Sequence, residues 1–135
     1  MIARPGQITP LHFHWDKMED IINRAGGGLV FELYNATKDE KLADTPVQYS
    51  QDGLRKTIQA GKKLLLKPGE SLTLPPYLYH KFYGQGSPVL IGEVSMVNDD
   101  ASDNRFLEVG RFPEIEEDEE PKYLLCNDYQ KFLSL

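Results

Sequence analysis

Two of the three histidines in this 135-residue chain lie two positions apart near its start, at His12 and His14 in "TPLHFHWDKMED". Because side chains alternate along a β-strand, both imidazoles would point to the same side of a strand, roughly 7 Å apart along the chain. At that spacing they can bind one metal ion. Glu19 follows an odd number of residues later, so a bend or hairpin must intervene before its carboxylate can join them.

The third histidine, His80 in "LPPYLYHKFYG", is the only imidazole left to complete a set of three histidines and one glutamate. Imidazole and carboxylate ligands suit Mn, Fe, Ni, Co or Zn and leave positions open for a substrate. A single histidine is usually a surface or hydrogen-bonded residue, but here all three fall where a shared site needs them. We therefore predict a metal site formed by His12, His14, Glu19 and His80.

The segments that must position these residues have the composition of short β-strands, and Gly and Pro residues separate them. The runs rich in Val, Ile, Leu, Phe and Tyr are 29–36, 62–68, 70–75, 80–84 and 88–98. Many short strands with frequent turn signals predict a sandwich or barrel. Segment 16–27 is ambiguous, because its apolar residues have helical spacing, whereas as a strand it places Lys17, Glu19 and Ile21 on one face. A short helix is predicted at 127–135.

Length and composition predict a single domain, residues 1–135, in the cytoplasm. No run approaches the roughly 18 apolar residues of a membrane span, and the one cysteine, Cys126, fits a reducing compartment. The net charge of −6 is local, since "EIEEDEE" (114–120) holds six of the 21 acidic residues, and the other 15 balance the 15 basic ones. Nothing in this balance predicts a nucleic-acid partner.

Two spacing patterns resemble the two motifs of the cupin superfamily. Residues 6–26 read G-x5-H-x-H-x4-E-x6-G, which matches the first motif at every fixed position. Residues 69–84 read G-x5-P-x-Y-x2-H-x3-G, where Tyr77 replaces the usual Gly and Gly84 the usual Asn. These departures concern turn geometry and leave His80 in place. The resemblance implies an all-β fold, a small double-stranded, jelly-roll-like β-barrel with the ligands inside, and it favours a strand for the ambiguous segment.

A closer resemblance, to the D-lyxose isomerase family of metal-dependent cupin sugar isomerases, covers almost the whole chain. It implies that the four predicted ligands bind a divalent metal, Mn²⁺ first and Zn, Co, Ni or Fe as alternatives, in a homodimer, with Lys17 beside the substrate. Family members usually have a substantial portion before the H-x-H strand, whereas Met1 is eleven residues ahead of His12, so the chain is either a compact version or a fragment. The stretches that carry the resemblance are "PLHFHWDKMEDIINRAGGGLVFELYNA", "LPPYLYHKFYG", "GEVSMVNDD", "DNRF" and "GRFPEIEEDEEPKYLLCNDY".

The resemblance implies conversion of D-lyxose to D-xylulose, or D-mannose to D-fructose, with hydrogen moving between C1 and C2 through a cis-enediol. A divalent ion can stabilise the charge on the enediolate while a carboxylate carries the proton. Since the ligands are committed to the metal, the carboxylate must come from elsewhere. Glu93, the single acid in an apolar strand, is one candidate, unless alternation turns it to solvent. The resemblance places a catalytic acid in the acidic run, with Glu117 first and Glu114 next.

Further polar residues are candidates for substrate binding. Lys17 could hold a sugar hydroxyl or stabilise an oxyanion, or be a surface lysine paired with Asp16 or Glu19. Arg111 and Asp128 lie in the stretches that carry the resemblance and could hydrogen-bond a neutral sugar. Two other functions stay open. A metal-dependent dioxygenase could use the same ligands but would prefer an apolar pocket, and a non-catalytic sugar- or metal-binding cupin would lack a positioned base.

Overall fold

The computed structural model describes residues 1–97, 99 and 102–108, and every regular element in this part is a β-strand. The all-β fold is therefore confirmed, while the helix predicted at 127–135 lies outside the described residues. No helix long and apolar enough to cross a membrane occurs among them. In chain order the strands are β1 (Ile2–Ala3), β2 (Ile8–Phe13), β3 (Glu19–Ala36), β4 (Leu42–Ala43), β5 (Val47–Gln51), β6 (Leu54–Ile58), β7 (Lys63–Leu66), β8 (Ser71–Leu74), β9 (Leu78–Ser95) and β10 (Arg105–Phe106).

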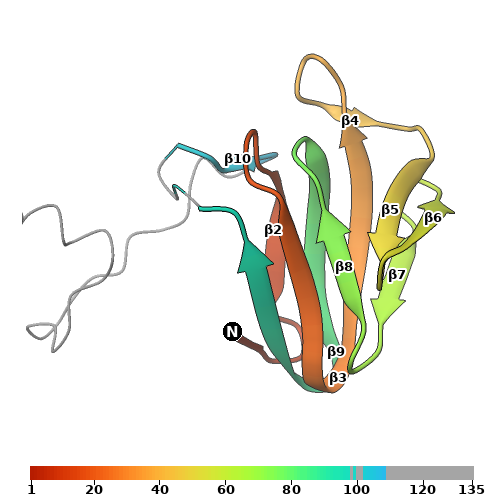
Figure 1. Ribbon diagram of the computed structural model, residues 1–135, viewed down its shortest axis with the longest axis vertical. Coiled ribbons are helices and arrows are strands. Elements are labelled where there is room, and N and C mark those ends of the chain that lie inside the picture. Colours follow the sequence, from red (N-terminus) through yellow and green to blue (C-terminus); the bar gives the residue numbers. More distant parts are fainter. Residues whose placement is uncertain (98, 100–101, 109–135) are drawn as a thin grey trace, which may run out of the picture.

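Two long strands, β3 and β9, form the frame of the fold. They pair antiparallel along their length, from Glu19 opposite Ser95 to Asn35 opposite Leu78. The strands follow the order β10-β2-β9-β3-β8-β5-β6, with β1 also beside β9, and β4 and β7 also beside β3. In Figure 1, β10 and β2 lie on one side of the molecule and β5, β6 and β7 on the other. The ambiguous segment is a strand from Glu19 onward, as the cupin resemblance favours.

Residues 80–84 and 88–95 are strand, as predicted, but they belong to one strand, β9, so the prediction of two separate strands is wrong. The chain bends at its glycines without leaving the sheet, and the pairing register of β3 with β9 shifts twice within residues 23–28. A Cβ added at Gly26 would lie only 2.0 Å from the carbonyl oxygen of Pro88. Glycine is therefore required here by the close approach of two backbones where the sheet turns a corner.

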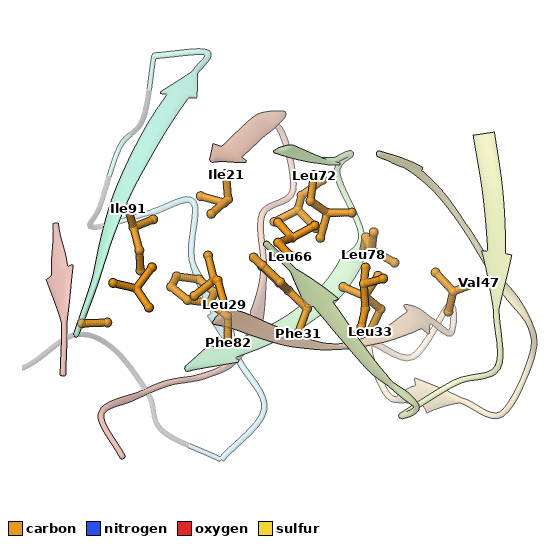
Figure 2. Packing of buried hydrophobic residues seen from close by; sticks show 14 residues of the cluster. Ile21, Leu29, Phe31, Leu33, Val47, Leu66, Leu72, Leu78, Phe82 and Ile91 are labelled. Carbon is orange, nitrogen blue, oxygen red and sulfur yellow. The ribbon is translucent and has the colours of Figure 1, made fainter. Parts of the chain in front are cut away.

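The hydrophobic core fills the space inside the bent sheet (Figure 2). Alternation along β3 buries Leu29, Phe31 and Leu33 completely, and truncating one such leucine to alanine typically costs about 2–5 kcal/mol of stability. Ile21 of β3 and Phe82 of β9 belong to this core and also line a cavity at its edge. The core thus forms part of the wall of that cavity.

Candidate metal centre

Four side chains from three strands and one turn converge on one point, and three of them line this cavity. His12 lies on β2, Glu19 begins β3, His80 lies on β9, and His14 follows the end of β2. One ligand atom from each lies within 4.8 Å of all the others, so a single ion can contact all four. Each side chain is at most 4% exposed. The structure therefore brings together all four residues that the sequence predicted as ligands.

Strand pairing positions two of the histidines directly. His12 of β2 lies opposite His80 of β9, so the sheet itself sets these two imidazoles side by side, with ring centroids 4.2 Å apart. Since β2 ends at Phe13 and β3 begins at Glu19, residues 14–18 form the bend that the odd spacing predicted. Glu19 returns on the inner side of β3, where it is buried.

Hydrogen bonds orient all three imidazoles in the same way. Each Nδ1 lies within hydrogen-bonding distance of a backbone carbonyl oxygen. The distances are 2.8 Å from His12 to Pro10, 2.5 Å from His14 to Asp103 and 2.9 Å from His80 to Leu78. A carbonyl can only accept, so Nδ1 carries the hydrogen and each Nε2 presents a lone pair. This is the arrangement in which backbone carbonyls support metal-binding histidines.

The lone pairs of His14 and His80 face a carboxylate, and a positive charge between them would stabilise this arrangement. Oε1 of Glu19 lies 3.1 Å from Nε2 of His80 and 3.6 Å from Nε2 of His14, and both Nε2 atoms are buried without a hydrogen-bond partner. Protonation of His12 is unfavourable, because burial and then the Coulombic effect of His80 lower its pKa to about 3. Three imidazole nitrogens and one carboxylate oxygen therefore fit a divalent cation.

Lys17 lies buried between two carboxylates. Its Nζ is 2.8 Å from Oε2 of Glu19 and 3.0 Å from Oε1 of Glu93. Burial alone would lower the pKa of Lys17, but the two carboxylates outweigh it and raise that pKa, so the ammonium stays charged. Burial would likewise raise the pKa of Glu19, but its contacts with His14, His80 and Lys17 lower it. Lys17 thus forms an ion pair with Oε2 of Glu19, while Oε1 of Glu19 faces His14 and His80.

Glu93 lies on the inner side of β9, opposite Ile21 of β3. It lines a cavity of about 310 Å³ together with three of the four candidate ligands, His12, His14 and Glu19. The polar side chains of Thr9, Lys17 and Asn104 share this cavity. The alternative that alternation turns Glu93 wholly to solvent is wrong, because its side chain is 39% exposed and contacts buried Lys17. The alternative of Lys17 as a surface residue is also wrong, because Lys17 is 5% exposed.

Asp103 is a residue that the sequence did not single out. Its Oδ1 accepts hydrogen bonds from the backbone N–H groups of Trp15 at 2.7 Å and Asp16 at 3.0 Å, and its Oδ2 accepts one from Lys17 at 2.9 Å. Its backbone oxygen accepts the hydrogen of His14. The only signal was its place in "DNRF", one of the stretches that carry the family resemblance, and its partners are more than 80 residues away.

Four predicted site residues lie outside the described part of the chain, and their roles stay predictions. They are Arg111, Glu114, Glu117 and Asp128.

An antiparallel β-barrel whose inner face presents three histidines and one glutamate defines a cupin with a candidate metal centre. A family model described as D-lyxose isomerase matches residues 1–129. Proteins named D-lyxose/D-mannose isomerase from Serratia proteamaculans and Escherichia coli O157:H7 are 53% and 50% identical over 99% and 98% of this chain. The chain spans 60% of the length of each of these relatives. It belongs to the D-lyxose isomerase family.

Proposed function

We propose that this chain is a metal-dependent aldose–ketose isomerase that interconverts D-lyxose and D-xylulose, with D-mannose and D-fructose as the second pair of substrates. The observation that carries the proposal is one polar cavity lined by a charged lysine, a further carboxylate and three of the four clustered candidate ligands, with the fourth, His80, within 4.8 Å of the others. The names of the two relatives support the choice of sugars. Mn²⁺ as the metal, a homodimer and a cytoplasmic location complete the proposal.

The residues divide the chemistry between them. His12, His14, Glu19 and His80 would hold a divalent ion, which supplies positive charge that stabilises the developing enediolate. The carboxylate of Glu93 takes the proton from one of the two reacting carbons and returns it to the other, while the hydroxyl proton passes from one sugar oxygen to its neighbour, so that no proton is gained or lost overall.

The ammonium of Lys17 has two tasks in this proposal. It holds the Glu93 carboxylate at 3.0 Å, and it supplies a hydrogen-bond donor where negative charge develops on a sugar oxygen. Burial keeps water away from this ammonium, which strengthens its interaction with such a charge. Beyond the described residues, Arg111 and Asp128 are proposed to bind sugar hydroxyls, and Glu117, then Glu114, are the alternative proton carriers.

The polarity of the cavity bears on the two alternative functions. A dioxygenase acting on an aromatic substrate would favour apolar walls, whereas this cavity has Thr9, Lys17, Glu93 and Asn104 along its lining. A non-catalytic binding protein would need no carboxylate beyond the ligands. The position of Glu93 beside Lys17 therefore supports an enzyme over a binding module.

The proposal is tested by turnover of the purified chain. Protein that is stripped with EDTA and reloaded with Mn²⁺ should convert D-lyxose to D-xylulose. It should also convert D-mannose to D-fructose. The stripped protein should convert neither sugar. If folded, metal-loaded protein leaves every sugar unchanged, the isomerase proposal is wrong; tight sugar binding without turnover would favour the non-catalytic alternative.

A further inference from the structure

The three histidines receive their orientation from two different sources. His12 and His80 each donate to a carbonyl two residues earlier in the chain, those of Pro10 and Leu78, so local backbone geometry fixes their rings. His14 lies past the end of β2 and donates to the carbonyl of Asp103, which is 89 residues away. The orientation of His14 thus depends on a contact that its own neighbours do not supply.

The Asp103 carboxylate holds the chain that follows His14. It accepts hydrogen bonds from three successive N–H groups, those of residues 15–17. Hydrogen bonds to a charged acceptor are stronger than neutral ones, and a buried N–H without a partner is costly. Lys17 is buried, so its N–H depends on this acceptor.

Asp103 is itself held by contacts other than those it makes with residues 14–17. Its N–H donates to the carbonyl of Asp99 at 2.8 Å, and the strand that follows, β10, pairs with β2 so that Phe106 lies opposite His12. Asp103 therefore provides a fixed point on the sheet for the turn.

We propose that Asp103 is a positioning residue of the metal centre, acting through the imidazole of His14 and the ammonium of Lys17; this inference rests on the proposed metal-binding function of the site. The carbonyl of Asp103 sets which nitrogen of His14 faces the ion. The carboxylate sets where Lys17 meets Glu19 and Glu93. One residue thus couples the metal ligand to the proposed proton-transfer pair.

Metal affinity measured on the full chain tests this inference without any need for turnover. Asp103→Ala removes all three acceptor contacts, and we expect Mn²⁺ to bind about 10–100-fold more weakly, the usual effect of losing an outer-shell partner. The visible spectrum of the Co²⁺-loaded protein should also change, because it reports the geometry of the ligands. Asp103→Asn keeps one acceptor oxygen but sets an amide N–H₂ towards the N–H of Lys17, so we expect a smaller loss, about 3–10-fold.

Asp52→Ala is the matched control. The Asp52 carboxylate also accepts a backbone N–H, that of Ser71 at 2.7 Å, but it lies away from the metal centre. This variant should lower the thermal midpoint and leave both Mn²⁺ affinity and the Co²⁺ spectrum unchanged.

Three outcomes would overturn the inference. One is an Asp103→Ala protein that binds Mn²⁺ within about threefold of wild type with an unchanged Co²⁺ spectrum. Another is an equal loss of affinity in Asp52→Ala. The third outcome applies if the Asp103→Ala protein does not fold. In that case, an Asp103→Asn protein with unchanged Mn²⁺ affinity and an unchanged Co²⁺ spectrum would overturn the inference. Weakened metal binding in the Asp103 variants beside a wild-type chain that converts no sugar would refute the isomerase proposal and leave this inference standing.

Discussion

The metal centre consists of two halves that differ in what positions them. His12 and His80 face each other across the β2–β9 pairing, and each ring donates to a carbonyl two residues back. His14 and Lys17 lie in the turn between β2 and β3, where Asp103 supplies their anchoring hydrogen bonds from more than 80 residues away. Strand register thus places a ligand with no help from distant side chains, whereas a turn of this kind needs a specific long-range partner.

Removing a ligand from the strand-positioned half should have the largest effect. His80→Ala leaves two imidazoles and one carboxylate, and we expect metal content after dialysis to fall to background and turnover to be lost with it. The expected loss of affinity exceeds the roughly 10–100-fold that an outer-shell change costs. Lys81→Ala is the matched control, because the next side chain on β9 pairs with Glu32 away from the cavity. Full metal occupancy in His80→Ala would contradict its assignment as a ligand.

Glu93→Gln tests the point where the two halves meet, since Glu93 lies on a regular strand and Lys17 on the turn. The four ligands are untouched, so metal content should match wild type. Turnover should fall by about 10²–10⁴-fold if the carboxylate carries the proton. Glu117→Gln is the paired variant. An unchanged rate in Glu93→Gln together with a large loss in Glu117→Gln would move the proton transfer to the acidic run.

The strand-positioned half could be predicted from the sequence, and the other half only in part. Alternation indicated that His12 and His14 point to the same side, because it depends on local backbone geometry. Glu19 and His80 joined the predicted set through the resemblance to the cupin motifs, and His80 also because it is the only other histidine. Nothing local indicated Asp103, since its partners are set by how β10 returns to β2.

The long strands were misjudged for a related reason. Gly26 and Gly27, which separate two of the predicted runs, lie where two backbones approach closely, whereas Gly86 inside β9 has a positive φ of 87° and open space around it. A glycine allows both a turn and a close approach, and only the neighbouring strand decides between them.

The pH dependence of stability should reveal the buried imidazoles in the metal-free protein. The pKa of His12 is lowered from 6.5 to about 3 in the folded state, so below pH 6.5 the unfolded chain binds a proton that the folded chain does not. Stability therefore falls as the pH drops, by about 2 kcal/mol from this residue between pH 7 and pH 5, with a slope that approaches about 1.4 kcal/mol per unit below pH 6.5. Urea unfolding of metal-free wild type and His12→Gln at pH 7 and pH 5 measures this effect. Equal pH dependence in the two proteins would refute the prediction.

The smallest expected effect concerns Tyr77, which joins the halves because its N–H donates to the carbonyl of His14 at 2.9 Å. Tyr77 has a φ of 60°, a left-handed conformation, at the position where the cupin motif usually has glycine. Its ring stacks on Phe13, with centroids 5.3 Å apart. Alanine and glycine at position 77 would both lose this stacking, but only glycine would also relieve the backbone.

We therefore expect Tyr77→Gly to be more stable than Tyr77→Ala by about 0.5–1 kcal/mol. The left-handed conformation costs alanine about 1–2 kcal/mol, and the greater freedom of glycine in the unfolded chain offsets part of that difference. At Arg55, an exposed position in β6, the order should reverse, because an extended backbone gives glycine no advantage. Urea unfolding of the four variants measures both differences. Alanine more stable than glycine at both positions would show that backbone strain at Tyr77 does not contribute to stability.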